Sequence, residues 1–278
     1  MPPGRAYLGA WVNPAGTTTD RSASALQQLV SLEQATGVSP AILSVYTSFA
    51  APAPVALLRE ISQRGAIPLV SWACAPTAAV AAGYDDAVIS NFASQLRQFG
   101  RAVFVRWFWE MNLRTASSSR CNAGGGPDTF VAAWKRVWNL FKQAGASNVA
   151  LVWCPGVNGD PSGMAPYFPG SAYVDWIGAD GYDRRHLGTA GFSEVFAAWY
   201  REFQGYDKPM MVAETGAMTV DQAAYLAGIG TSLPAAFPLV AAVVYFDARG
   251  PDGSWVLSAD GARAFGALGR NPYFSASG

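Results

Sequence analysis

The sequence of 278 residues contains a single histidine, His186, and this scarcity excludes several kinds of enzyme. A catalytic zinc site built on several histidines is not available, and the HExxH motif is absent. A Ser-His-Asp or Cys-His enzyme would have to use His186, and no G-x-S-x-G motif presents a serine. In an enzyme without a cofactor, proton transfer would therefore fall to carboxylates.

Charged residues are also scarce, at 14% of the chain, and the 19 basic and 19 acidic residues cancel. Nucleic acids and anionic membranes attract basic surfaces, so the absence of a basic run argues against both as partners. The uncharged stretch 222–246 is interrupted by proline and glycine, which leaves no 18-residue apolar run for a membrane span. We therefore expect a soluble protein.

Eight short apolar runs alternate with helical patterns over the whole chain. The predicted strands are 6–12, 41–49, 66–73, 101–109, 148–153, 174–181, 209–213 and 239–246. The predicted helices are 22–36, 54–63, 85–99, 129–143, 193–203, 220–229 and 260–268. This alternation indicates an α/β fold with a parallel sheet, and eight units predict a (β/α)8 TIM barrel spanning residues 1–278 as a single domain. A doubly wound open sheet is the alternative, but the first turn, Asn13-Pro14-Ala15-Gly16, lacks the glycine-rich phosphate-binding pattern.

Two of the six glutamates stand at the ends of predicted strands, where the active site of a barrel lies. Glu110 ends the fourth strand and Glu214 ends the seventh, whereas the other four lie in helical patterns. Two carboxylates facing each other across the mouth, flanked by aromatic residues, suit the acid/base and nucleophile of a retaining glycosidase, which lie about 5–5.5 Å apart. The alternative is that one glutamate forms a buried ion pair with Arg106, which shares the strand parity of Glu110.

The residues around both glutamates resemble the motifs of glycoside hydrolase family 26. Arg106-Trp107-Phe108-Trp109-Glu110-Met111-Asn112 resembles its acid/base motif, R-P-x-H-E-M-N, and Ala213-Glu214-Thr215-Gly216 resembles its nucleophile motif. Tyr167-Phe168-Pro169-Gly170 and the segment 174–182 resemble its Y-P-G and Y-V-D-x-x-G-x-D-x-Y elements. Leu8-Gly9-Ala10-Trp11 fits its first strand, so the resemblance spans nearly the whole chain in the family's order.

The resemblance implies a retaining barrel enzyme that needs no metal or cofactor. Glu110 would be the general acid/base, with the higher pKa of the pair, and Glu214 the nucleophile. Tyr182 would hydrogen-bond the nucleophile, and Arg106 beneath it would favour its charged form. The family contains β-mannanases, β-1,3-1,4-glucanases and β-1,3-xylanases, and we expect β-1,4-mannan first, with the other glycans as alternatives. Trp109 replaces the family's histidine, and an indole donates one hydrogen bond but accepts none, which weakens the case for mannan more than for hydrolysis.

Aromatic residues at predicted strand ends are candidates for stacking on sugar rings, with packing at the barrel rim as the alternative. Together with Arg106, Asn112 and Tyr182 from the motifs, the predicted substrate-binding residues are Trp11, Trp72, Trp109, Trp153 and Tyr245. Tyr46 and Trp255 are further candidates with the same alternative. Carboxylates near the mouth could bind sugar hydroxyls or pair with Arg184, Arg185 or a backbone cap; they are Asp180, Asp183 and Asp247. His186 lies in the same loop as Asp183.

Three cysteines are too few for a disulfide scaffold, but Cys74 and Cys121 follow the third and fourth strands and are the expected pair, leaving Cys154 free. The partner we expect is a polysaccharide or oligosaccharide, bound by a monomer. A polymer does not enter cells, so we expect an exported protein whose signal peptide has been removed, because MPPGRAYLGA does not resemble one. Two rival functions remain: a carbohydrate-binding barrel without turnover, and a barrel enzyme acting on small phosphorylated metabolites.

Overall fold

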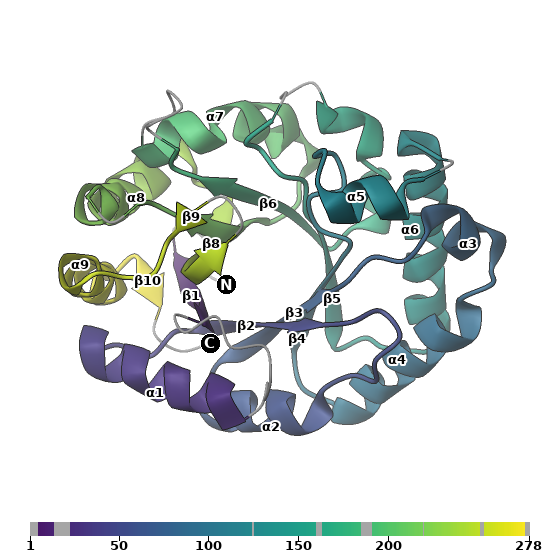
Figure 1. The fold of residues 1–278 in the computed structure, drawn as a ribbon, viewed down its shortest axis with the longest axis horizontal. Helices are drawn as coiled ribbons and strands as arrows, with labels where there is room; N and C mark the ends of the chain where they lie inside the picture. The colour runs from purple at the N-terminus through teal and green to yellow at the C-terminus, as the bar shows by residue number, and fades with distance from the viewer. Residues whose placement is uncertain are drawn as a thin grey trace.

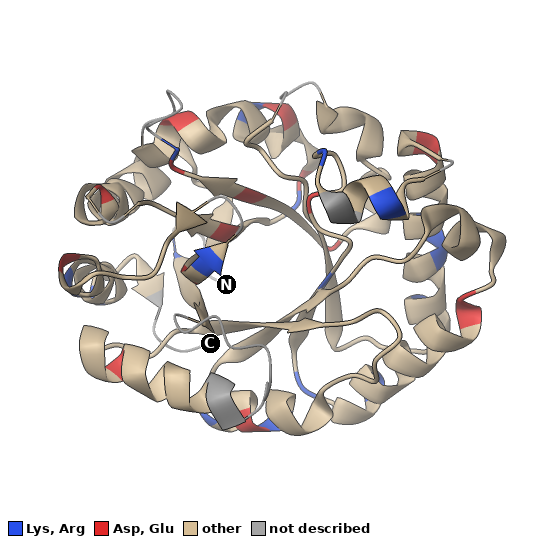
Figure 2. Ribbon diagram, in the orientation of Figure 1, with Lys and Arg blue, Asp and Glu red and all other residues tan. Residues whose placement is uncertain are grey.

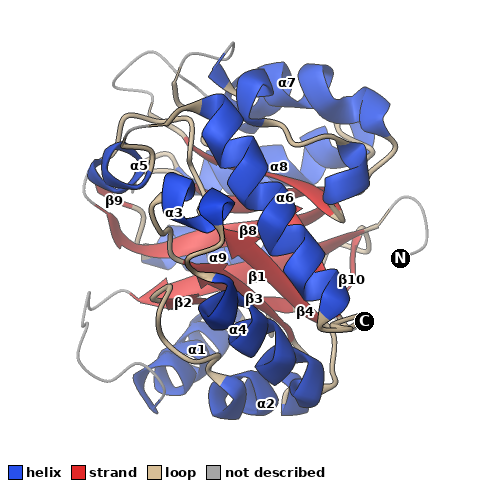
Figure 3. Ribbon diagram, turned by 90° about the vertical axis from the view of Figure 1, so that its right-hand side faces the viewer, coloured by secondary structure: helices blue, strands red, loops and turns tan. Residues whose placement is uncertain are grey.

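Figure 1 shows strands arranged around a central axis with helices outside them. The computed structural model describes residues 5–13, 23–123, 125–159, 163–184, 191–218, 220–250 and 253–275, and the statements below concern these residues. Figure 3, turned by 90°, shows the helices packed against the outside of the strands, with α3, α5 and β9 at one end of the barrel.

Eight parallel strands form a closed barrel. They are β1 (Ala6–Asn13), β2 (Ile42–Thr47), β3 (Ile67–Trp72), β4 (Val103–Trp107), β5 (Val149–Trp153), β6 (Trp176–Tyr182), β7 (Met210–Gly216) and β8 (Val240–Gly250). Each strand pairs with the next, and β8 closes the barrel against β1 from Tyr7↔Ala242 to Asn13↔Ala248. Two short strands extend the sheet: β9 (Gly253–Ser254) is antiparallel to the end of β8, and β10 (Phe274–Ser275) is parallel to β1. The predicted (β/α)8 barrel is confirmed.

Helices cover the outside of this barrel. They are α1 (Ala23–Thr36), α2 (Val55–Gln63), α3 (Thr77–Ala82), α4 (Asp86–Phe99), α5 (Ala116–Cys121), α6 (Pro127–Gln143), α7 (Gly191–Phe203), α8 (Gln222–Ala236) and α9 (Ala259–Gly269). Between β5 and β6 the described residues form only the 3-10 turns η2 (Ala165–Tyr167) and η3 (Ser171–Tyr173), and η5 (Gln204–Tyr206) follows α7. None of the described helices is long and apolar enough to cross a membrane.

The sequence did not predict α3 and α5, and it ended α8 too early. Both missed helices have six residues, too few to show a helical period. A capping box in which Thr115 accepts a hydrogen bond from the backbone of Ser118 starts α5. Helix α8 continues past residue 229 and contains Pro234.

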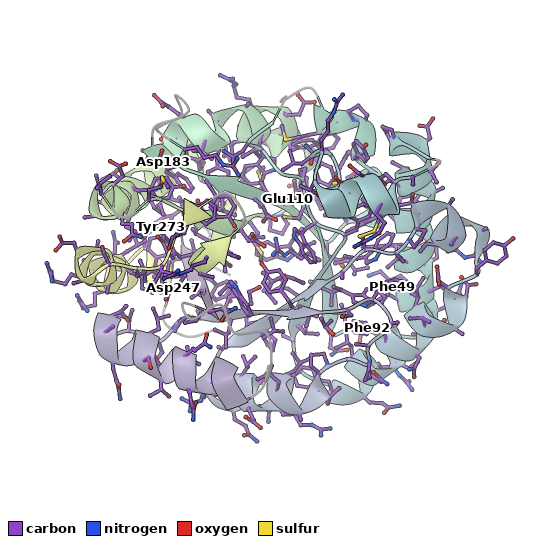
Figure 4. All side chains as sticks on the ribbon, viewed as in Figure 1. Phe49, Phe92, Glu110, Asp183, Asp247 and Tyr273 are labelled. Carbon is purple, nitrogen blue, oxygen red and sulfur yellow. A yellow bond between two sulfur atoms is a disulfide. The ribbon has the colours of Figure 1, made fainter. Side chains whose placement is uncertain are left out.

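The core has two layers, one inside the barrel and one between strands and helices. Residues of one strand parity fill the barrel interior; they include Ile42, Leu69, Phe104, Val152, Met211 and Val244. Residues of the other parity meet the helices in a much larger cluster. Figure 4 shows Phe49 and Phe92 in this outer layer, near α4. Because side chains alternate along a strand, Arg106 shares the inward parity of Phe104, and its guanidinium lies inside the barrel.

Candidate active site

A cavity of about 500 Å³ opens at the end of the barrel where the strands run out into loops. Glu110 and Glu214 both line it. The aromatic residues of its wall are Trp11, Tyr46, Phe108, Trp109, Tyr182, Phe246 and Trp255. Figure 4 shows Glu110 nearer the middle of the barrel than Asp183 and Asp247, which lie toward α8 and α9. The structure therefore brings together the two carboxylates that the sequence singled out.

Glu214 faces the barrel interior because β7 contains a β-bulge. Ala179 of β6 pairs with Val212, but the next residue, Asp180, pairs with Glu214, so Ala213 is an extra residue. Ala213 belongs to the interior cluster, and strict alternation would turn the following residue outward. The bulge interrupts that alternation and re-aims the side chain, as bulges near active sites do.

Both oxygens of the Glu214 carboxylate accept hydrogen bonds. Oε1 accepts from the Tyr46 hydroxyl and from Nη2 of Arg106, and Oε2 accepts from the Tyr182 hydroxyl at 2.5 Å. The sequence left open whether one of the two glutamates forms a buried ion pair with Arg106. The structure shows this ion pair, and the glutamate is Glu214. These three donors from β2, β4 and β6 hold the carboxylate in one orientation at the cavity wall.

Arg106 is fully buried and connects two carboxylates. Its Nη1 lies 2.7 and 2.5 Å from the oxygens of Asp180, and its Nε donates to Ser71 at 2.8 Å. Burial alone would lower the pKa of Arg106, but Asp180 and Glu214 raise it well above its usual value, so the guanidinium stays charged. Burial raises the pKa of Asp180, and Arg106 opposes that shift. The thiol of Cys154 donates to Asp180 at 3.2 Å.

The two tyrosines beside Glu214 are held protonated. Burial, and then the negative charge of Glu214, raise the pKa of Tyr46 well above its usual value, and the same two causes act in the same order on the pKa of Tyr182. Both phenols therefore remain hydrogen-bond donors over the pH range in which proteins are handled. The Tyr46 hydroxyl also accepts from Nη2 of Arg106 at 2.9 Å.

Glu110 lies in a turn, not on the strand as predicted. Strand β4 ends at Trp107, and the backbone has positive φ at Phe108 (49°) and at Glu110 (55°). The backbone N–H of Glu110 donates to the carbonyl of Cys154 at 2.8 Å, and its carbonyl accepts from Leu113 at 3.1 Å. A left-handed backbone costs a non-glycine residue about 1–3 kcal/mol, and such strain clusters at functional sites. The turn, and not the parity shared with Arg106, aims this carboxylate at the cavity.

Of the predicted substrate-binding residues, Trp11, Trp109 and Tyr182 line the cavity. The rings of Trp11 and Trp109 pack edge-on against Tyr46, with centroids 4.7 and 5.3 Å from its ring. The guanidinium carbon of Arg106 lies 5.3 Å from the Trp109 ring centroid. Both indoles are partly exposed, so they are available to contact a ligand.

The interpretation of Trp72, Trp153 and Tyr245 as sugar-binding residues is wrong, because their side chains are fully buried away from the cavity. Trp72 stacks on Phe92 with centroids 4.2 Å apart, in the layer between strands and helices. Trp153 donates from Nε1 to the carbonyl of Tyr167, and Tyr245 donates to the carbonyl of Trp255. A buried ring cannot stack on a polysaccharide.

Arg106 and Asn112 support the site from behind and do not line the cavity. The amide of Asn112 forms two hydrogen bonds with the backbone of Gly156, donating at 2.8 Å and accepting at 2.9 Å. It thereby joins the turn that carries Glu110 to the loop after β5. A Cβ on Gly156 would lie 2.4 Å from the Leu113 side chain and 3.3 Å from that of Glu110, so a larger residue there would displace Leu113 and crowd Glu110.

The structure decides between the alternative roles that the sequence left open for several residues. Asp180 pairs with Arg106 and does not reach the cavity, and Tyr46 binds Glu214. Asp247 accepts a hydrogen bond from the backbone N–H of Leu257 at 2.8 Å, and burial raises its pKa to about 6. Trp255 forms part of the cavity wall. His186 and Arg185 lie outside the described residues.

The predicted disulfide between Cys74 and Cys121 is confirmed, with Cα atoms 6.2 Å apart, and Cys154 is free and buried. The disulfide links the loop after β3 to α5, and Cys74 lines the cavity. The Thr77 hydroxyl donates to the carbonyl of Cys121 at 3.2 Å, which adds a second link between the two loops. Within the described ranges, no group of three or more His, Cys, Asp or Glu residues is placed to hold a metal ion.

Comparison with known proteins finds relatives among glycan-degrading enzymes, whereas no family model matches the chain. Endoglucanase H of Acetivibrio thermocellus is 25% identical over 257 residues, covering 86% of this chain and 27% of that protein. Beta-1,3-xylanase TXYA of a Vibrio species is 25% identical over 142 residues, covering 49% of this chain and 28% of that protein. The chain thus spans about a quarter of the length of both curated relatives.

Among solved structures, the catalytic domain of a family 26 endo-β-1,4-mannanase from Bacillus sp. JAMB-750 superposes with a TM-score of 0.75 at 16% identity. The match covers 98% of this chain and 87% of that one. At this identity the likeness shows a common fold. The comparisons thus confirm that the chain has the fold of a family 26 mannanase.

Proposed function

We propose that the chain is a retaining, endo-acting glycoside hydrolase of family 26 that cleaves β-linked polysaccharide. Glu214 is the nucleophile and Glu110 the general acid/base. The observation that carries this proposal is the meeting of both carboxylates at one aromatic-lined cavity, one of them fixed by three donors and the other on a strained turn. No cofactor takes part in this reaction.

The reaction proceeds by two displacements. A carboxylate oxygen of Glu214 attacks the anomeric carbon while Glu110 gives its proton to the glycosidic oxygen, so that the C–O bond breaks and the leaving sugar departs. The product is an ester between the glycone and Glu214. Glu110, now ionised, takes a proton from water, and that water attacks the same carbon, releasing the sugar with its configuration retained.

The surrounding residues prepare Glu214 for attack. Arg106, Tyr46 and Tyr182 fix the direction of the carboxylate, and preorganised donors of this kind lower the cost of reorganisation during the reaction. Trp11 and Trp109 stack on or flank sugar rings near the scissile bond. Arg106 and Asp180 act through Glu214 and do not touch the substrate.

The first-choice substrate is β-1,4-mannan, because the enzyme from Bacillus sp. JAMB-750 with the same fold is an endo-β-1,4-mannanase. The curated relatives are named for endoglucanase and β-1,3-xylanase activity, which makes mixed-linkage β-glucan and xylan the alternatives. A polymeric substrate implies an exported protein, and the single cavity described requires no second subunit, so we propose that it acts as a monomer.

The test uses pure mannan, mixed-linkage β-glucan, cellulose and β-1,3-xylan, with reducing ends and product anomers followed by NMR. We expect shortened oligosaccharides whose first-formed anomer is β. Glu214→Gln and Glu110→Gln should each lose at least about a thousandfold in kcat while still binding polymer. Glu202→Gln, an exposed residue on α7, is the matched control. A first-formed α-anomer refutes retention, and binding without turnover by the parent protein identifies a carbohydrate-binding barrel.

A further inference from the structure

Three arginines line the cavity beside the two glutamates: Arg120, Arg184 and Arg249. The chain is poor in charge, with 14% charged residues in all, so this gathering at one cavity is conspicuous. A neutral polysaccharide offers hydroxyl groups and C–H faces, which uncharged polar and aromatic side chains can bind. The three arginines therefore point to a substrate that also carries negative charge.

Arg120 and Arg249 are exposed, and no described carboxylate lies within 4 Å of either guanidinium. Asp247 is two residues from Arg249, but its Oδ1 accepts from the backbone of Leu257. Both guanidiniums thus have their hydrogen-bonding capacity directed to solvent or to a ligand.

The backbone under Arg120 is fixed at both ends of α5. The helix starts at the capping box of Thr115 and ends at Cys121, which is bonded to Cys74. The side chain of Asn122 donates to the carbonyl of Met111 at 3.0 Å, linking the end of α5 to the turn that carries Glu110. The position of α5, which carries Arg120, is therefore fixed relative to the Glu110 turn by the disulfide and by hydrogen bonds.

The backbone under Arg249 is fixed as well. Arg249 pairs with Ser254 in the antiparallel β8–β9 ribbon, and Trp255 donates from its backbone to Ala248 at 3.0 Å. The Trp255 ring lies directly against Gly250 and forms part of the cavity wall. Figure 1 places α5 and the β8–β9 ribbon on different sides of the barrel mouth, and Figure 2 shows a basic residue on each.

We propose that the cavity takes β-linked glycans whose sugars carry oxyanion groups, carboxylates or sulfate esters, and that Arg120 and Arg249 bind these groups on sugars flanking the scissile bond. The inference rests on the proposed glycosidase function and adds charged substituents to the β-linked backbones proposed there as substrates. A guanidinium binds an oxyanion through two parallel hydrogen bonds, which suits both carboxylate and sulfate. Because α5 follows the Glu110 turn and β8 neighbours the strand of Glu214, the two arginines flank the catalytic pair.

The test compares one glucomannan in three forms: unmodified, carboxymethylated, and sulfated to the same charge density. Binding is measured by isothermal titration with the Glu214→Gln variant, and hydrolysis with the parent enzyme. We expect at least tenfold tighter binding of one or both charged forms at low salt, weakening as salt rises. The form that binds tighter identifies the oxyanion.

Arg120→Gln and Arg249→Gln remove the proposed contacts, and Arg59→Gln, an exposed residue on α2, removes the same charge away from the cavity. We expect the ratio of kcat/KM on the charged polymer to that on the neutral polymer to fall at least fivefold in each cavity variant and to stay unchanged in Arg59→Gln. Melting temperatures equal to that of the parent show that the variants fold.

Two results separate this inference from the proposed function. If the parent cuts all three polymers with equal kcat/KM, or if Arg59→Gln lowers the ratio as much as the cavity variants do, the inference is wrong and the glycosidase function stands. If no polymer is cut, but the charged forms bind through Arg120 and Arg249, the glycosidase function is wrong and the cavity is an anionic-glycan binding site.

Discussion

The hydroxyl of Tyr182 donates a hydrogen bond of 2.5 Å to Oε2 of Glu214, and it is the only described donor to that oxygen. The other oxygen, Oε1, accepts from both Tyr46 and Arg106. The carboxylate is thus held asymmetrically, with one oxygen bound by two donors and the other by one. The oxygen bound by a single phenol is the one more easily freed to attack.

Removing the Tyr182 hydroxyl should nevertheless slow the reaction without displacing the substrate, because this phenol is the donor that orients Oε2. A hydrogen bond to a charged group contributes about 1.5–3 kcal/mol, so Tyr182→Phe is expected to lower kcat roughly 10- to 100-fold with little change in KM. Tyr46→Phe should have a smaller effect, because Arg106 still holds Oε1. Steady-state kinetics on the best polymer measure both, with Tyr273→Phe as the control; equal effects of the two cavity variants would contradict the asymmetry.

Deleting Ala213 should lower activity without turning Glu214 outward. The deletion removes the extra residue, so Glu214 follows Val212 in regular alternation and still faces the barrel interior, but β7 loses the local bend with which the bulge aims the carboxylate. Ala213→Gly keeps the residue count and should retain most of the activity. Circular dichroism establishes that both proteins fold, and a folded deletion protein with the activity of its parent would show that the bulge does not orient the nucleophile.

Removing the disulfide should lower stability. Cys74 and Cys121 are 47 residues apart, and a cross-link of this span stabilises a folded protein by about 2–4 kcal/mol, mainly by restricting the unfolded chain. The double variant Cys74→Ser/Cys121→Ser is expected to lose this amount in urea unfolding. Cys154→Ser alters the free thiol alone and serves as the comparison. A loss below about 0.5 kcal/mol contradicts the prediction.

Asp247 should make stability depend on pH. Its pKa is about 6 in the folded protein, raised by burial from 3.8, so the folded protein retains a proton that the unfolded chain releases. Stability therefore falls as pH rises through the window from about 4 to about 6, and a difference of two pH units corresponds to about 3 kcal/mol. Asp247→Asn keeps an acceptor for Leu257 and removes the charge.

The Asp247→Asn variant should therefore be more stable than its parent at pH 7.5 and nearly equal to it in stability at pH 4. Thermal unfolding at several pH values measures the gain, and Asp128→Asn, on the surface near the start of α6, controls for a general effect of charge. A gain that is the same at pH 4 and pH 7.5 would show that Asp247 does not titrate in this window.

The barrel and the carboxylate pair could be predicted from sequence because both depend on local patterns: apolar runs with helical segments between them, and glutamates at the ends of those runs. The sequence assigned Trp72 and Trp153 wrongly because a strand end fixes depth along the barrel but not the side a residue faces. Ser71 and Val152 face inward, so their neighbours Trp72 and Trp153 face the helices. Counting parity from an interior residue would have corrected this.

The geometry around Glu214 could not be predicted in that way. The bulge at Ala213 appears only when the register of β7 against β6 is known, and Tyr46 reaches Glu214 from a strand 168 residues away in the chain. Contacts of this kind depend on barrel closure, which brings strands together that no local pattern connects. The same holds for the pairing of Asp180 with Arg106.

The left-handed backbone at Glu110 lowers the stability of the fold at the residue that we propose as the catalytic acid. Glycine or asparagine adopts φ near 55° at less cost than glutamate, so replacing Glu110 by either would relax the turn while deleting the proposed acid. A barrel relieved of catalysis would thus gain stability from a single substitution at this position. Glutamate is a residue that the backbone disfavours here and that the proposed reaction requires.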